Sequence, residues 1–134
     1  MVSMKHYGWA LTCVGGAGVL LTAVMGYTYA PMVQSPPFRS PEAYRILFWH
    51  VPFAWTSFIA FCLLFIGALS WFLKRKEWGW NLFCTGSDLG LLFGLGVVIS
   101  GPIWGSAEWG VPWDWGDLRL NTFGLLTAVA LFIV

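Results

Sequence analysis

The sequence predicts an all-α fold, a multi-pass bundle of transmembrane helices that forms one membrane domain over residues 1–134. Of these residues 58% are hydrophobic and only 10% are charged, against about 25% charged residues in ordinary soluble domains. The apolar residues form long blocks, and the segments between the blocks hold nearly every charge and proline. The formal net charge of +1 is too small to attract phosphates, which excludes nucleic-acid binding.

A helix that crosses the hydrocarbon core needs about 20 mostly apolar residues. Three stretches meet this requirement, at residues 9–30, 52–73 and 82–104. The first is too long for the apolar region of a signal peptide, so we expect a retained helix. Pro52 suits the first turn of the second helix. A fourth apolar run, residues 120–134, would rise only about 22 Å. We therefore expect a truncated fourth span, and a chain that is the N-terminal portion of a longer protein.

Positive charges predict the orientation of the bundle. Lys74, Arg75 and Lys76 follow the second span directly, and the positive-inside rule places such a cluster in the cytoplasm. Three complete spans then bring residues 31–51 and 103–119 to the same outer face. We therefore expect a protein of the cytoplasmic (inner) membrane, with its tryptophan-rich loop and His50 on the periplasmic side.

Small residues predict helix contacts. Gly86, Gly90 and Gly94 recur every four residues in the third span, a stripe that lets another helix approach closely. We expect tight packing within the bundle, and a homodimer face is the alternative. Small residues at the same spacing, at positions 18, 22 and 26, make the first span the predicted partner of the third.

Asp88 is the one acidic residue inside a predicted span, about 9 Å from its start. A charge is costly at this depth. Neighbouring spans offer no basic partner, which argues against an ion pathway, and Thr85 and Ser87 stand beside it. Stabilisation of the helix end is therefore the favoured role.

Four of the ten tryptophans lie within twelve consecutive residues of the outer loop 103–119, namely Trp104, Trp109, Trp113 and Trp115. Interface anchoring needs one or two tryptophans at each helix end, so it does not explain four among glycines and prolines. Such a surface suits a large, flat, apolar ligand. In the same loop, Arg119 could pair with ligand carboxylates, and Asp117 could orient the arginine or an indole N–H.

Haem matches this chemistry, because it combines an aromatic plane, an iron that takes a nitrogen ligand, and two propionates. His50 supplies an imidazole on the same predicted face, although a polar interfacial role is the alternative. Arg39 and Arg45 are further propionate partners or ordinary loop charges. The sequence has no C-x-x-C-H motif, so covalent attachment of haem is not expected.

The loop WGVPWDWGDLRLNT resembles the tryptophan-rich WWD motif of the haem-handling membrane proteins of cytochrome c maturation, which include CcmC, CcmF and CcsA. The string HVPFAW around His50 and the ending DLRLNT look most like CcmC. The resemblance covers about residues 44–122. Two features depart from the family pattern: Gly116 separates Trp115 from Asp117, and Pro112 stands where another aromatic residue is common.

The resemblance implies a six-helix protein whose outer WWD loop binds haem b transiently and non-covalently, between two axial histidines. His50 matches the first of them, and the second is expected beyond Val134. The implied haem-contacting residues are Trp104, Trp109, Trp113, Trp115, Asp117, Arg119 and Arg45. The implied partners are the haem chaperone CcmE, the transporter subunits CcmA and CcmB, and the small protein CcmD.

The leading hypothesis is therefore haem handling without catalysis. A CcsA-type cytochrome c synthase is an enzymatic alternative, and it predicts a longer polypeptide with additional helices. A small-molecule or ion transporter is the alternative from a different class. It requires polar groups in mid-membrane, where Asp88 is the only charged candidate.

Overall fold

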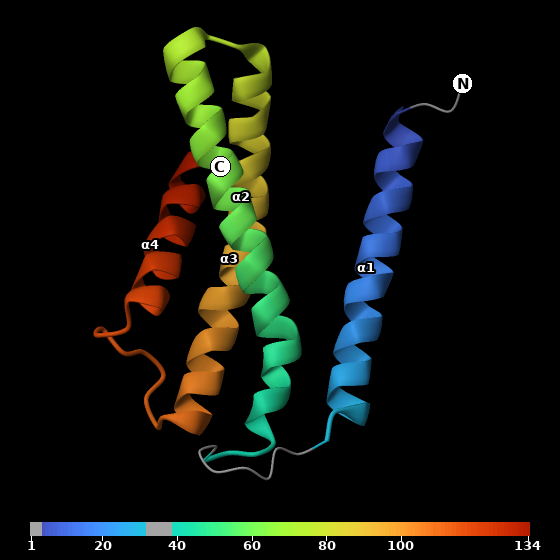
Figure 1. Ribbon diagram of the computed structural model, residues 1–134, viewed down its shortest axis with the longest axis vertical. Coiled ribbons are helices and arrows are strands. Elements are labelled where there is room, and N and C mark those ends of the chain that lie inside the picture. Colours follow the sequence, from blue (N-terminus) through green and yellow to red (C-terminus); the bar gives the residue numbers. More distant parts are fainter. Residues whose placement is uncertain (1–3, 32–38) are drawn as a thin grey trace.

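A computed structural model describes residues 4–31 and 39–134 of the chain (Figure 1). The elements in order are α1 (Met4–Tyr29), the 3-10 helix η1 (Ala43–Ile46), α2 (Leu47–Lys74), α3 (Glu77–Glu108) and α4 (Leu118–Ile133). Three helical stretches have the length and apolar composition needed to cross a membrane, at His6–Tyr29, Ala43–Lys74 and Glu77–Glu108. The predicted class, an all-α membrane helix bundle, is confirmed.

Helix α2 begins earlier than its apolar composition suggested. It starts at Leu47, directly after η1, so Pro52 lies inside the helix and the predicted first-turn position for it was wrong. Proline has no N–H and leaves a carbonyl one turn earlier without its helical donor. The same extension places His50 in the first turn of the helix, on a regular backbone.

Helices α2 and α3 form an antiparallel hairpin whose backbones touch. Arg75 turns the chain between them in the left-handed conformation, with φ of 48°. A Cβ atom added to Gly86 of α3 would lie 2.5 Å from the backbone nitrogen of Leu64 in α2, and one added to Gly90 would lie 2.7 Å from the Phe61 ring. The predicted packing of the glycine stripe within the bundle is confirmed.

The predicted partner of that stripe was wrong. Helix α1 stands apart from α3 (Figure 1) and meets the bundle at α2, where Gly26 lies against the Phe48 side chain. Gly16 and Gly18 of α1 have no neighbouring atom within 4 Å of an added Cβ. Glycine spacing identifies a face that another helix can approach, but it does not identify the helix that does so.

The helix-end role predicted for Asp88 was also wrong. Helix α3 begins at Glu77, so Asp88 lies eleven residues into the helix, about 16 Å from its start. The side chain is exposed on the helix surface. The error arose because the predicted span began at residue 82, five residues after the helix starts at Glu77.

One end of the bundle gathers the segments of interest. The start of α2, the end of α3 and the start of α4 all lie there, opposite the Arg75 hairpin (Figure 1). Helix α4 packs on α3, where an added Cβ on Gly94 would lie 3.2 Å from the Thr127 Cβ. His50 and the tryptophan-rich loop therefore share one end, as the number of spans predicted.

Replacing Gly86 by alanine should destabilise the bundle, because the added methyl group would overlap the backbone of α2. Overpacking of this kind costs about 1–3 kcal/mol, which we expect to measure as a lower free energy of unfolding in mixed detergent micelles. Gly16→Ala is the matched control, since its methyl group meets open space. Equal stability of the two variants would contradict backbone contact at Gly86.

Candidate functional site

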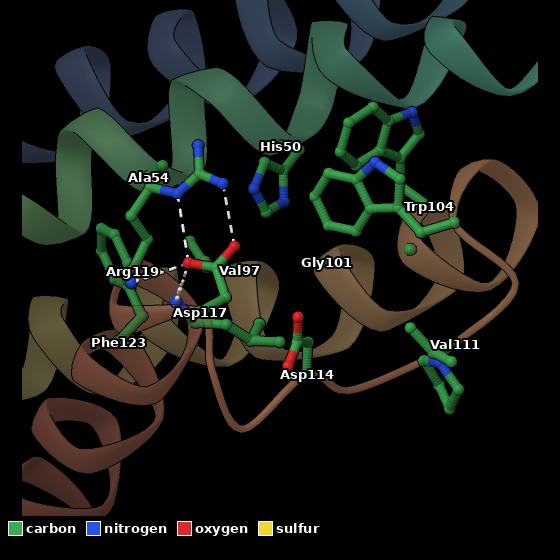
Figure 2. Close-up of a pocket in the computed structure, with 14 residues that line it drawn as sticks. His50, Ala54, Val97, Gly101, Trp104, Val111, Asp114, Asp117, Arg119 and Phe123 are labelled. Carbon is green, nitrogen blue, oxygen red and sulfur yellow. Dashed lines mark hydrogen bonds and ion pairs between the residues drawn. The ribbon is translucent and has the colours of Figure 1, made fainter. Parts of the chain in front are cut away.

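A cavity of about 230 Å³ lies at the loop end of the bundle, between α2, α3 and the segment that leads into α4 (Figure 2). Most of its wall is apolar or aromatic, and the polar groups are one imidazole, two carboxylates and one guanidinium. The lining residues are His50, Ala54, Val97, Gly101, Trp104, Gly105, Trp109, Val111, Pro112, Asp114, Asp117, Arg119, Leu120 and Phe123.

The His50 ring is held in one orientation by α3. Its Nδ1 lies 2.8 Å from the Ser100 hydroxyl oxygen. That hydroxyl donates its own hydrogen to the Gly96 carbonyl, at 2.5 Å. The serine oxygen must therefore accept the hydrogen bond, and His50 Nδ1 must carry the proton. The lone pair then resides on Nε2, which has no hydrogen-bond partner in residues 4–31 and 39–134.

A glycine provides room for this imidazole. A Cβ added to Gly101, one residue after the serine, would lie 3.4 Å from His50 Cε1 and 3.4 Å from a Leu120 methyl group. Larger side chains would therefore press on the ring. Within the described segments, no group of three or more His, Cys, Asp and Glu side chains is placed to hold a metal ion.

Asp117 caps α4 and orients Arg119. Its carboxylate accepts hydrogen bonds from the backbone N–H groups of Arg119 at 2.9 Å and Leu120 at 3.4 Å, as an N-cap does. The same carboxylate pairs with the Arg119 guanidinium through Nη2 at 2.8 Å and Nε at 3.2 Å (Figure 2). These hydrogen bonds from Arg119 lower the pKa of Asp117, so the carboxylate is ionised at neutral pH. The Arg119 side chain remains 80% exposed at the cavity and is open to a further anion.

Two of the four predicted tryptophans face the cavity. The rings of Trp104 and Trp109 meet edge to face, with centroids 4.7 Å apart and an interplanar angle of 71°. Trp104 Nε1 is buried and has no hydrogen-bond acceptor among the residues that the structure describes. A buried donor without an acceptor is unusual in a folded protein.

The other two tryptophans anchor the loop instead of lining the cavity. Trp113 Nε1 donates to the Asn121 side chain at 3.1 Å, and its ring closes on Gly124 of α4. The backbone carbonyl of Trp115 accepts from the Asn121 amide at 2.8 Å, while the Trp115 ring is 83% exposed. Composition predicted an aromatic surface, but it could not distinguish rings that line the cavity from rings that hold the loop to a helix.

The extra residue in the loop is absorbed by a turn. Asp114 Oδ1 accepts from the Gly116 N–H at 2.8 Å, and the Asp117 N–H donates to the Asp114 carbonyl at 3.1 Å. This turn delivers Asp117 to the start of α4 as its cap. Asp114, an acidic residue of the loop to which the sequence assigned no role of its own, thus shapes the loop and lines the cavity.

A second acidic residue of this segment, to which the sequence assigned no role of its own, is Glu108. Its carboxylate is only 8% exposed and accepts from the backbone N–H groups of Arg39 at 2.7 Å and Ser40 at 3.0 Å. The end of α3 is thereby tied to the segment before α2. The sequence did not predict this contact, because an acidic residue in a loop is ordinarily solvated.

Arg45 does not line the cavity. The Arg45 Nη1 forms an ion pair with the Glu42 carboxylate at 3.2 Å, three residues earlier in the chain. The Arg45 side chain borders a separate groove that Trp104 also lines. The structure therefore brings together His50, Trp104, Trp109, Asp117 and Arg119, and it leaves Arg45 apart from them.

Comparison with known proteins gives a consistent result. The family model described as CcmC, Heme exporter protein C, matches residues 2–133. A putative cytochrome c biosynthesis ccmC-like mitochondrial protein of Marchantia polymorpha is 36% identical over 95 residues, covering 70% of this chain and 41% of the relative. The protein of the same description from Arabidopsis thaliana is 31% identical over 119 residues, which cover 87% of this chain and 44% of the relative. Heme exporter protein C of Paracoccus denitrificans is 30% identical over 95 residues, which cover 66% of this chain and 39% of the relative. The chain spans less than half the length of these relatives.

Removing the cap should loosen the start of α4. In Asp117→Ala the Arg119 and Leu120 amides lose their acceptor, and loss of an N-cap costs about 0.5–2 kcal/mol. We expect faster hydrogen–deuterium exchange at these two amides. Asp117→Asn, which retains a side-chain oxygen acceptor, should exchange more slowly than the alanine variant. Wild-type protection in Asp117→Ala would show that the cap does not hold this turn.

Proposed function

Because the chain belongs to the heme exporter protein C (CcmC) family, we propose that it handles haem during cytochrome c maturation. In this proposal haem b binds transiently at the cavity between α2, α3 and α4 and then leaves, without a covalent bond. The single observation that carries the proposal is the imidazole of His50, whose Nδ1 proton is committed to Ser100 and whose Nε2 lone pair is uncommitted among the described residues.

The donor set of the cavity fits haem. Metal-ligating histidines usually donate their other ring N–H to a fixed acceptor, which sets the tautomer and the ring plane. Ser100 is such an acceptor for His50. Haem brings an iron that accepts the Nε2 lone pair and two propionates that accept hydrogen bonds. Arg119, which Asp117 orients, is the proposed propionate partner, and the buried Trp104 N–H is a second donor.

The size of the cavity indicates how the ligand would be held. Its volume of about 230 Å³ is below the range of about 300–1,000 Å³ that is usual for pockets enclosing a small molecule. A porphyrin would therefore insert one edge between the Trp104–Trp109 pair and His50, with the remainder outside the cavity. A ligand that is gripped at one edge is easier to hand on than one that is fully enclosed.

The chain's own residues supply no second axial histidine at this end. His6, the other histidine, is in the first turn of α1, which begins at the opposite end of the bundle (Figure 1). We propose that the second axial ligand comes from outside residues 1–134. We further propose that the site faces the periplasmic side of the cytoplasmic membrane, and that haem passes to the chaperone CcmE, with CcmA, CcmB and CcmD as the assembly partners.

Replacing His50 by alanine should weaken or shift the visible absorption band of haem bound to the detergent-purified protein, because the iron loses its nitrogen ligand. His6→Ala is the matched control, since it removes a histidine from the opposite end and should leave the band unchanged. Identical spectra for wild type and His50→Ala would contradict ligation by His50.

The role of Ser100 can be tested separately. Ser100→Ala removes the acceptor of His50 Nδ1 and releases the ring. Loss of such a supporting hydrogen bond typically lowers metal affinity about 10–100-fold, and we expect a loss of this size in a haem titration. Ser106→Ala is the control, because Ser106 makes the same bond to a carbonyl one turn earlier but does not touch His50. An unchanged affinity in Ser100→Ala would remove the support for a fixed tautomer.

A further inference from the structure

A second groove shares Trp104 with the His50 cavity. It has a volume of about 440 Å³ and runs between α2 and α3, where Trp49 and Phe53 face Ile99 and Ile103. Trp104 borders both this groove and the His50 cavity. None of the groove's other lining residues lines that cavity, so the two spaces are distinct.

The groove is polar at one end and apolar along the rest of its length. Glu42 and Arg45 lie at the end nearest the loops, and Phe53 and Gly96 lie at the other. Along α3 it extends from Ala107 to Gly96, eleven residues, or about 16 Å at 1.5 Å per residue. This distribution matches an amphiphile with one charged end and a hydrocarbon chain.

The apolar wall is accessible from the side of the bundle. Ile99 is 61% exposed, Ile103 is 59% exposed, and Tyr27 of α1, which flanks the groove, is 65% exposed. Helix α1 stands apart from α3 and leaves this side uncovered by the described residues (Figure 1). In a transmembrane bundle such a face meets the acyl chains of lipids.

Arg45 has unused capacity to bind an anion. Its side chain is only 22% exposed, and its single ion pair, at 3.2 Å, is with Glu42, which is itself 61% exposed. The Arg45 Nε is buried and finds no acceptor in the described part of the chain. A guanidinium offers five N–H donors in a planar fork that matches the oxygens of a phosphate. The arginine is therefore incompletely paired at a membrane-facing groove.

We propose that this groove binds one membrane phospholipid, whose phosphodiester pairs with Arg45 and whose acyl chain lies along Phe53, Ile99 and Ile103. The occupant is a phospholipid and not a soluble anion, because most of the groove is apolar and open to the side. The site is separate from the proposed haem cavity and does not depend on haem binding.

Lipid binding can be measured by native mass spectrometry of the delipidated full chain in detergent. We expect one dioleoylphosphatidylglycerol to bind at least tenfold more tightly than dioleoylglycerol, which has no phosphate. Arg45→Gln should remove this preference, whereas Arg39→Gln, at an exposed arginine outside the groove, should keep it. Equal binding of the two lipids to the wild type, or an unchanged preference in Arg45→Gln, would overturn the proposal.

A second pair of variants retains the arginine and fills the groove. Ala107→Phe places a ring beside Arg45, while Ser106→Phe places one on the neighbouring exposed position, which does not line the groove. Ala107→Phe should lower phospholipid binding about tenfold, and Ser106→Phe should not. If Arg45→Gln fails to fold, this pair decides alone, and equal binding by both variants overturns the proposal. The assay contains no haem, so its result is independent of the proposed function.

Discussion

The close contact between the backbones of α2 and α3 is the constraint on which the rest of the structure depends. Glycines at positions 67, 79 and 86 leave no room for a Cβ between the two helices, and their packing fixes how the helices are rotated and aligned. With that alignment set, the first turn of α2 lies beside the last third of α3, and His50 meets Ser100.

The loop between α3 and α4 is fixed at several points, which explains how an irregular segment can present a defined surface. Glu108 connects the end of α3 to the segment before α2 by hydrogen bonds, and Trp113 is hydrogen-bonded to Asn121. Asp117 begins α4 and orients Arg119 with one carboxylate. Trp104 and Trp109 remain free of such anchoring roles, since neither indole is hydrogen-bonded to the loop among the described residues.

Sequence patterns predicted the membrane class and the shared end of His50 and the tryptophan-rich loop, because hydrophobic length and the number of crossings depend on local composition alone. The predictions failed where a residue's role depends on which other segment of the chain it contacts. The α3 stripe indicated a close approach but not that α2 makes it, and Asp88 was assigned to a helix end that lies eleven residues earlier. Likewise, the four tryptophans of the loop look equivalent in the sequence, yet Trp113 is hydrogen-bonded to Asn121 while Trp104 lines the cavity. Such choices are made by tertiary packing.

Two side chains of α3 connect the two spaces at the loop end. Trp104 borders the cavity and the groove, and Ser100 lines the groove while it holds the His50 ring. An occupant of one space that moved either side chain would change the shape of the other space. Linkage is reciprocal: the factor by which one occupant changes the affinity of the second equals the factor by which the second changes the affinity of the first. Any coupling between the membrane-facing groove and the cavity would therefore pass through Trp104 and Ser100, which lie one turn apart on α3.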